Sequence, residues 1–376
     1  MSSRAGFMLI VVVLVGVVSQ PSFGDDTNPQ FPGRVAEFSL APEQWRRVDV
    51  SVDRALEFLA TQQGRDGSFA SIDTGQPGVT ALSVLAFLSR GHVPGEGPYG
   101  KSLSRAVDFV LSQQQENGLL FDKEIGPWQY GSAAHTGIYN HAISGLMLTE
   151  IYGMGATDQE ERLRVGIEKA CDFTLNHQSR FNRNRQEQGG WRYLRLSDQR
   201  SDADLSITSW QLLFLRSARN AEFEVPQPAI NDAMDYVERC FDPNRGTFVY
   251  CIVSGRMSTP AMAGAGILSL ALGGRHDSEQ AQRAGRWMAQ QPFDRYPAVD
   301  RYHYSAYYCS QAAFQLGGEY WSKFYPRLEQ ALTASQRPDG SWNRESRDSQ
   351  YGNVYSTALS VLALTPPYQI LPIYQR

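Results

Sequence analysis

The hydrophobic positions of the chain form two kinds of helical segment that alternate along its length. In the first kind, apolar residues recur at i, i+3, i+4 and i+7 and charged residues fill the other positions, which is typical of a helix with one face in water. The first set is Val52, Ala55, Leu56 and Leu59, and later sets begin at Leu103, Ile167, Ile230, Ala281 and Phe324. This spacing predicts six amphipathic helices.

Segments of the second kind are apolar on most faces and rich in Ala, Gly, Ser and Thr, so we expect helices that are surrounded by protein. They span residues 79–88, 138–152, 205–218, 260–272, 303–316 and 354–364. The alternation predicts an all-α fold: a single closed (α/α)6 toroid of six helical hairpins, with inner and outer helix rings. The alternative is an open superhelix, whose ends would need polar capping repeats that neither terminus carries.

The two ends of the chain differ from this helical region. The apolar run 5–18 is too short to cross a bilayer and precedes the small-x-small site Ser22-Phe23-Gly24, which predicts a signal peptide at 1–24; an uncleaved anchor is the alternative. We therefore expect an exported protein of the periplasm or cell envelope, with no membrane span in the mature chain. Residues 25–47 are expected to be an irregular lead-in, 48–365 the toroid, and 366–376 a Pro-rich strap.

Charge and cysteine content indicate which partners, disulfides and metals to expect. The formal net charge is −4 and no basic stripe stands out, so nucleic acid is not expected as a partner. Cys240 and Cys251 are close enough in sequence to bridge in an oxidising compartment, but they could equally be buried thiols. No pair of cysteines or histidines has the spacing of a zinc site, so we expect no metal and no cofactor.

A turn motif occurs twice, as Gln63-Gly-Arg-Asp66-Gly67-Ser-Phe69 and as Gln336-Arg-Pro-Asp339-Gly340-Ser-Trp342. Asp-Gly favours a tight turn because glycine adopts positive φ without a Cβ clash. The motif resembles the QW repeats of squalene and oxidosqualene cyclases and of protein prenyltransferase β subunits. Further resemblance lies in residues 137–142, 204–211, 317–321 and 371–376.

From about residue 48 onward, the chain is similar to exported "prenyltransferase and squalene oxidase repeat" proteins of planctomycete-type bacteria, which as a class have no established activity. The resemblance implies the (α/α)6 toroid and a central cavity for an apolar or isoprenoid small molecule. It also implies that polar groups at the N-termini of inner helices ring the cavity. The candidate ligand-binding residues at this rim are Tyr139, His141, Ser206, Thr208, Tyr302, His303, Tyr304 and Tyr355. His141 could instead be a hydrogen-bonded core histidine, and the tyrosines could pack between helices.

Asp202-Ala-Asp204-Leu-Ser206 resembles the DxDD-T element of squalene–hopene cyclases, with Leu205 in place of the last Asp and Ser206 in place of Thr. The resemblance implies that Asp204, with Asp202 beside it, is a catalytic acid kept protonated by burial or by the neighbouring carboxylate. The alternative is that Asp204 caps the inner helix that starts at residue 205, a position that aspartate favours. A short distance from its carboxylate to the amides of Ile207 or Thr208 would favour the cap.

Asp300-Arg-Tyr302-His303 resembles the stretch that holds the zinc histidine of protein prenyltransferases. The position of the partner ligands reads Ser258-Thr-Pro-Ala261 here and offers no Asp, Cys or His, so the ligand set is incomplete. The sequence therefore favours a non-catalytic ligand-binding or scaffold module of the cell envelope. The alternative is an enzyme that acts on an isoprenoid or polyprenyl substrate with Asp204 as its acid, so whether the protein is an enzyme stays open; protein partners are not predicted.

Overall fold

The computed structural model describes residues 40–126, 132–154, 157–178, 185–194, 203–253, 256–345 and 347–375. All of them belong to one compact unit, Glu37–Arg376. The predicted signal peptide lies outside the described residues, as does the lead-in up to residue 39. The first helix begins at Pro42, earlier than the expected boundary at residue 48, because a proline is well suited to the first turn of a helix.

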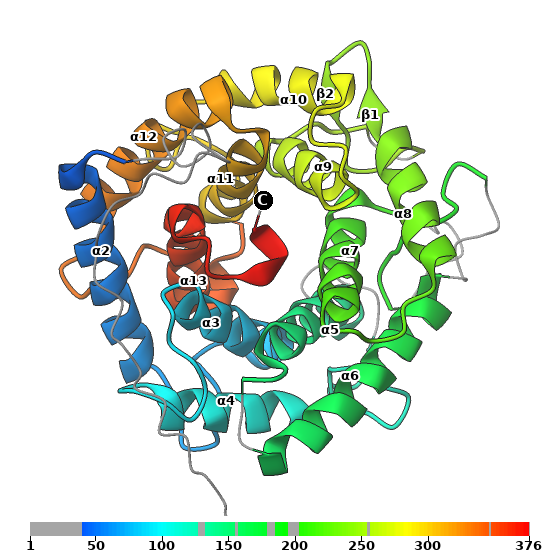
Figure 1. The fold of residues 1–376 in the computed structure, drawn as a ribbon, viewed down its shortest axis with the longest axis vertical. Helices are drawn as coiled ribbons and strands as arrows, with labels where there is room; N and C mark the ends of the chain where they lie inside the picture. The colour runs from blue at the N-terminus through cyan, green and yellow to red at the C-terminus, as the bar shows by residue number, and fades with distance from the viewer. Residues whose placement is uncertain are drawn as a thin grey trace, which may run out of the picture. The chain divides into compact units, whose positions relative to one another are not determined.

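The described residues form two sets of helices that alternate along the chain. The outer set is α2 (Pro42–Thr61), α4 (Gly100–Ser112), α6 (Thr157–Gln178), α8 (Gln227–Arg239), α10 (Glu279–Ala289) and α12 (Gly318–Ser335). The inner set is α3 (Gly78–Leu88), α5 (Ala133–Ile151), α7 (Leu205–Asn220), α9 (Pro260–Leu272), α11 (Tyr302–Leu316) and α13 (Gly352–Leu364). Figure 1 shows the second set enclosed by the first. This arrangement confirms the predicted all-α fold of helix pairs.

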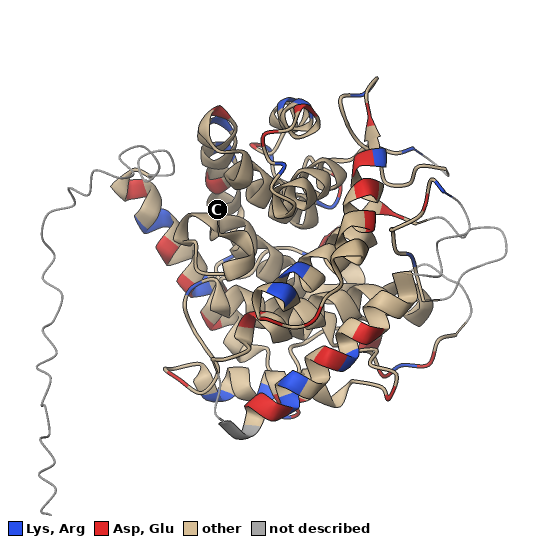
Figure 2. Cartoon of the chain, turned by 45° about the vertical axis from the view of Figure 1, so that its right-hand side comes forward, with Lys and Arg blue, Asp and Glu red and all other residues tan. Residues whose placement is uncertain are grey.

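Charge follows the same division. Lys, Arg, Asp and Glu lie mainly along the outer helices (Figure 2). The six inner helices carry only Glu150, Arg216 and Arg219 among these residue types. The other secondary structure in the described residues is short: the antiparallel strands β1 (Phe241–Asp242) and β2 (Thr247–Phe248), and the 3-10 turns η1 (Asp73–Gly75) and η3 (Ser349–Tyr351).

The first and last helix pairs are in contact. Each inner helix packs against the next, and α13 packs against both α3 and α2. On the outer ring, the Nη2 atom of Arg47 on α2 lies 2.9 Å from the Oε2 atom of Glu329 on α12, whose side chain is fully buried. The series of inner-helix contacts therefore returns to the helix where it started.

One hydrogen-bonded turn connects each of four outer helices to the outer helix of the following pair. In the first copy, Gln63 Nε2 donates to the carbonyl of Gly67 in its own turn at 3.0 Å and to that of Ser102 on α4 at 2.8 Å. Gly67 has φ +92°, and a Cβ there would lie 2.3 Å from the carbonyl oxygen of Arg105, so only glycine fits. The other three glutamines with their two acceptors are Gln114 (Gly118, Gly166), Gln178 (Gly189, Ala229) and Gln336 (Gly340, Ser51).

The same turn is also tied to the inner helix that follows it. The backbone N–H of Phe69 donates to Thr80 Oγ1 at 2.9 Å, and the N–H of Trp342 donates to Thr357 Oγ1 at 3.2 Å. In the other two copies the acceptors are Thr208, bonded to Trp191 N, and His141, bonded through Nδ1 to Leu120 N. His141 therefore takes the structural place of a threonine.

The C-terminal segment folds back into the ring. It contains the 3-10 turns η4 (Pro366–Tyr368) and η5 (Pro372–Tyr374), and Figure 1 shows it, in red, inside the inner helices. Gln315 Nε2 donates to the carbonyl of Tyr374 at 2.8 Å, and the N–H of Ile373 donates to Glu150 Oε2 at 3.3 Å. Because Gln315 and Glu150 lie near the C-terminal ends of α11 and α5, the segment covers that end of the ring.

Candidate functional site

A cavity of about 500 Å³ lies at the opposite end, among the N-terminal halves of the inner helices. Its aromatic lining residues are Tyr139, Tyr193, Trp210, Tyr250, Tyr304, Tyr351 and Tyr355. Its aliphatic lining residues include Val79, Leu82, Ile143, Met257, Ala261, Met262 and Leu359. The cavity is mostly apolar, with a few polar groups at defined positions, as is common for small-molecule sites.

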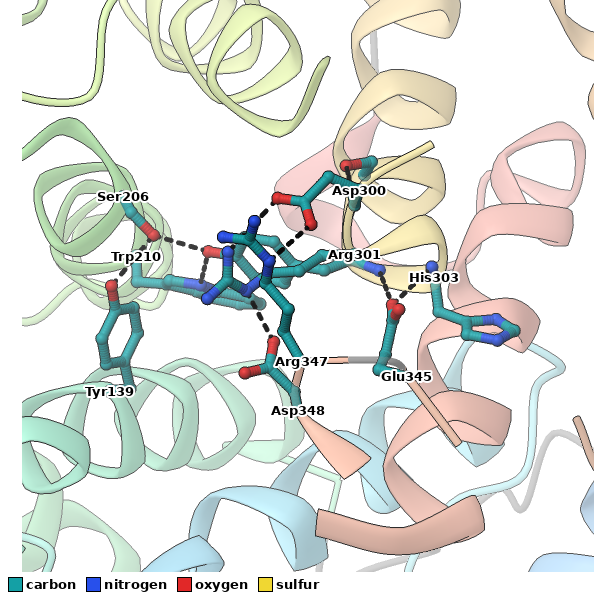
Figure 3. Close-up of polar contacts among 11 residues, drawn as sticks. Tyr139, Ser206, Trp210, Asp300, Arg301, His303, Glu345, Arg347 and Asp348 are labelled. Carbon is teal, nitrogen blue, oxygen red and sulfur yellow. Dashed lines mark hydrogen bonds and ion pairs between the residues drawn. The ribbon is translucent and has the colours of Figure 1, made fainter. Parts of the chain in front are cut away.

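A chain of hydrogen bonds runs along one wall of the cavity (Figure 3). Tyr139 Oη donates to Ser206 Oγ at 3.1 Å, and Ser206 Oγ lies 2.8 Å from Tyr304 Oη. The indole N–H of Trp210 donates to the same Tyr304 oxygen at 3.0 Å. Burial raises the pKa of Tyr304 to about 12 and also raises that of Tyr139, so both phenols are neutral at pH 7.

Four charged residues also line the cavity, and Figure 3 shows the side chains of Arg301 and Arg347 between those of Asp300 and Asp348. Arg301 Nε lies 2.8 Å from Asp348 Oδ2, and Arg347 Nε lies 3.1 Å from Asp300 Oδ1. Arg301 Nη1 lies 3.5 Å from the other oxygen of Asp300. The two positive and two negative charges balance, so the group is neutral as a whole.

Arg301 has a left-handed backbone, with φ 45° and ψ 63°, at the position preceding α11. This conformation is uncommon for a residue other than glycine and persists where neighbouring contacts enforce it. Glu345 supplies the missing cap, since its Oε1 accepts from the N–H of His303 at 2.6 Å and of Tyr304 at 3.1 Å. Burial raises the pKa of Glu345 to about 7, against the effect of these two amides.

Asp204 is fully buried and is not among the cavity-lining residues. Its Oδ1 accepts from the N–H of Ile207 at 2.8 Å, and its Oδ2 lies 2.5 Å from Nη1 of Arg192 and accepts from Tyr250 Oη at 3.2 Å. Burial raises the pKa of this carboxyl, and the charge of Arg192 is the strongest of the contacts that lower it. With a guanidinium and two further donors around it, we assign Asp204 as an ionised helix cap. Asp202 lies outside the described residues.

Four of the predicted rim residues, Tyr139, Ser206, Tyr304 and Tyr355, line the cavity. The other four do not. Thr208 and His141 are the acceptors of the repeated turn, and His141 Nε2 is also 2.9 Å from Thr174 Oγ1. Burial lowers the pKa of His141 to about 3, so it is a neutral core histidine.

Tyr302 and His303 contact residues other than the cavity lining: the segment that precedes α11 and, for His303, the inner helix α13 as well. Tyr302 Oη donates to the carbonyl of Phe293 at 2.7 Å. His303 Nδ1 lies 2.8 Å from Ser360 Oγ and its Nε2 lies 3.1 Å from Tyr296 Oη, while burial lowers its pKa to about 3. Both ring nitrogens of His303 are therefore occupied within the protein.

The charged residues of the cavity were not predicted from the sequence. Asp300 and Arg301 belong to the stretch whose histidine was a candidate ligand, and Arg192 follows the aromatic residue of a repeated turn. His135 also lines the cavity, and burial lowers its pKa to about 4. The described residues contain no group of three metal-ligating side chains, and Cys240 and Cys251 are both buried free thiols. None of the described helices is long and apolar enough to cross a membrane.

No family model matches the sequence, and no curated protein matches it. Solved structures do match. Type II terpene cyclase MstE from Scytonema is 14% identical, with a TM-score of 0.55, over 87% of this chain and 99% of that one. A glycosidase in complex with glucose is 14% identical, with a TM-score of 0.58, over 89% of this chain and 100% of that one. An unsaturated glucuronyl hydrolase specific for heparin is 11% identical, with a TM-score of 0.56, over 85% of this chain and 96% of that one.

At these identities the likeness concerns the fold alone. The chain shares the α/α-toroid fold of these structures, and its place in the terpenoid cyclase and prenyltransferase superfamily stays a prediction from the repeated turns. Membership of an exported planctomycete-type subgroup stays a prediction.

Proposed function

We propose that the chain is an exported protein whose toroid binds a small molecule with an apolar body in the cavity of the inner ring. The observation that carries the proposal is the hydrogen-bonded group of Tyr139, Ser206, Tyr304 and Trp210 on the wall of an otherwise apolar cavity. Aromatic rings provide contact area for an isoprenoid body, and the neutral hydroxyls provide orientation.

Binding is favoured over acid catalysis by the state of the carboxyl groups. Asp300 and Asp348 are the acidic side chains among the described cavity-lining residues, and each forms an ion pair with an arginine. Alkene protonation requires a protonated acid in the cavity, and Asp204 is neither a lining residue nor free of ion pairing. The alternative, an isoprenoid enzyme, is supported by the fold that the chain shares with a type II terpene cyclase.

The binding proposal can be tested by titrating the purified mature protein with farnesol, geranylgeraniol and glucose, using tryptophan fluorescence and calorimetry. We expect saturable binding of the isoprenoid alcohols, and we expect it to change the tryptophan fluorescence because Trp210 lines the cavity. Ile143→Trp should abolish it by filling the cavity, and Val50→Trp, at a position 54% exposed, should leave it unchanged. Binding that persists in Ile143→Trp, or no saturable binding at all, would contradict the proposal.

Export is a separate part of the proposal and needs its own measurement. The full-length chain should be recovered from the periplasmic or envelope fraction with Asp25 as its first residue, as cell fractionation and N-terminal sequencing would determine. Recovery of the intact chain from the cytoplasm would refute export without affecting the cavity.

A further inference from the structure

Arg192 is a buried cation in the cavity wall. It lines the cavity, yet only 8% of its side chain is exposed. The guanidinium lies between two tyrosine rings, with its Cζ 4.2 Å from the centroid of Tyr193 and 5.3 Å from that of Tyr250. The two phenol oxygens are 2.8 Å apart, so the rings hold one another around the cation. This packing fixes the orientation of the guanidinium plane.

Among the described residues, only Nη1 of this guanidinium has hydrogen-bond partners. Nη1 lies 2.5 Å from Asp204 Oδ2 and 3.0 Å from Tyr250 Oη. Nε is buried and has no hydrogen-bond partner among the described residues, and Nη2 likewise donates to none of them. Since Asp204 is not a lining residue and Nε is closed off by the protein, Nη2 is the nitrogen of Arg192 that is left for a ligand in the cavity.

From this geometry we infer that Arg192 is a subsite for a carboxylate on the ligand, bound through Nη2. The inference rests on the proposed binding function and specifies the polar end of its ligand. A carboxylate would give the Nη2 donors a charged acceptor, and such hydrogen bonds are stronger than those to a neutral group. The ligand class is therefore an apolar, isoprenoid-like acid.

The charges around the subsite are balanced and do not repel an anion. His135 and Arg301 also line the cavity, and the charges of Arg192 and Arg301 both lower the pKa of His135, to about 4 with burial as the main cause. Asp204 neutralises Arg192, and the acids among the described lining residues, Asp300 and Asp348, are each paired with an arginine. A single ligand carboxylate consequently meets no unpaired negative charge among the described lining residues.

The test compares three ligands with the same farnesyl body at pH 7.5, where the acid is ionised: farnesoic acid, its methyl ester and farnesol. We expect the mature protein to bind the acid at least about tenfold more tightly than the other two, as hydrogen bonds to charged groups imply. Equal affinity for all three would overturn the carboxylate subsite and leave the proposed function intact. Saturable binding of none of them would refute the proposed function itself. Farnesyl phosphate is measured as a fourth ligand, and tighter binding of it than of farnesoic acid would also overturn the carboxylate.

A variant pair locates the effect. Arg192→Lys keeps a cation beside Asp204 but has a single nitrogen and no counterpart of Nη2, so it should remove the preference for the acid over farnesol. Arg239→Lys is the matched control, because Arg239 also lies over a tyrosine ring, that of Tyr236, outside the cavity. An unchanged preference in Arg192→Lys would refute the assignment. The comparison of acid and ester in the unaltered protein decides the question if the variant fails to fold.

Discussion

Removing the side-chain amide of Gln336 tests whether the last helix pair is energetically joined to the first. Gln336 Nε2 donates to the carbonyls of Gly340 and Ser51, each at 2.8 Å. Its Oε1 accepts from Ser51 Oγ at 3.1 Å and from Arg54 Nη1 at 3.4 Å. A net hydrogen bond contributes about 0.5–1.5 kcal/mol, so we expect Gln336→Ala to lower the free energy of unfolding by about 2–4 kcal/mol.

Gln63 provides a matched comparison within the chain. Its Nε2 donates to the carbonyls of Gly67 and Ser102, and its Oε1 accepts from the side chains of Ser102 and Arg105. The groups are of the same kinds, but they join neighbouring pairs rather than the last and the first. Urea unfolding followed by circular dichroism should therefore give similar losses for Gln63→Ala and Gln336→Ala. A large loss for Gln63→Ala with less than about 0.5 kcal/mol for Gln336→Ala would refute the reasoning.

Three further predictions concern stability. Gly118→Ala should destabilise the protein by several kcal/mol in urea unfolding, because the backbone has φ +90° and the new Cβ would lie 2.0 Å from the carbonyl oxygen of Lys169; a neutral effect would contradict the packing of this turn. His141 and His303 have folded-state pKa values of about 3, below the ordinary 6.5, so stability should be full above pH 6.5 and fall as the pH drops towards 3. Each histidine should lower the free energy of unfolding by about 2 kcal/mol between pH 7.5 and pH 5, which urea unfolding at the two pH values would measure. An unchanged free energy of unfolding would argue against neutral burial. Tyr374→Ala should cost about 3–5 kcal/mol and lower the thermal midpoint, since the ring is only 5% exposed; an unchanged midpoint would show that the segment does not pack as described.

The helix pairs could be predicted from the sequence because each helix has a distinct pattern, amphipathic or apolar. Two of the four repeated turns were found by their Asp-Gly-Ser motif. The turn of Gln114 was missed because it reads Asn117-Gly118-Leu119, and the turn of Gln178 was missed because a longer segment separates the glutamine from its glycine. The feature shared by all four is the hydrogen bonding of the glutamine amide, which becomes visible only in three dimensions.

The site was harder to predict than the fold. His141 stood out as a polar residue in an apolar helix, but its neighbours show that it accepts the N–H of Leu120, as a threonine does in the other turns. The direction of a side chain near the start of a helix depends on the preceding loop. For this reason Arg301 and Tyr304 reach the cavity, whereas His303, between them in sequence, points the other way. Arg192 could not be placed because it lies outside the inner helices.

The position of the C-terminal segment restricts the route by which a ligand can enter and leave the cavity. Tyr374 bonds to Tyr307, whose ring is stacked on Trp210 at 5.3 Å between centroids, so the segment backs the deepest aromatic wall of the cavity. We therefore expect a long polyprenyl ligand to enter and leave at the end of the ring opposite the C-terminal segment. Any part of the ligand longer than the cavity would stay in solvent. Isoprenoid units beyond those that fit in the cavity should add nothing to the affinity of the ligand.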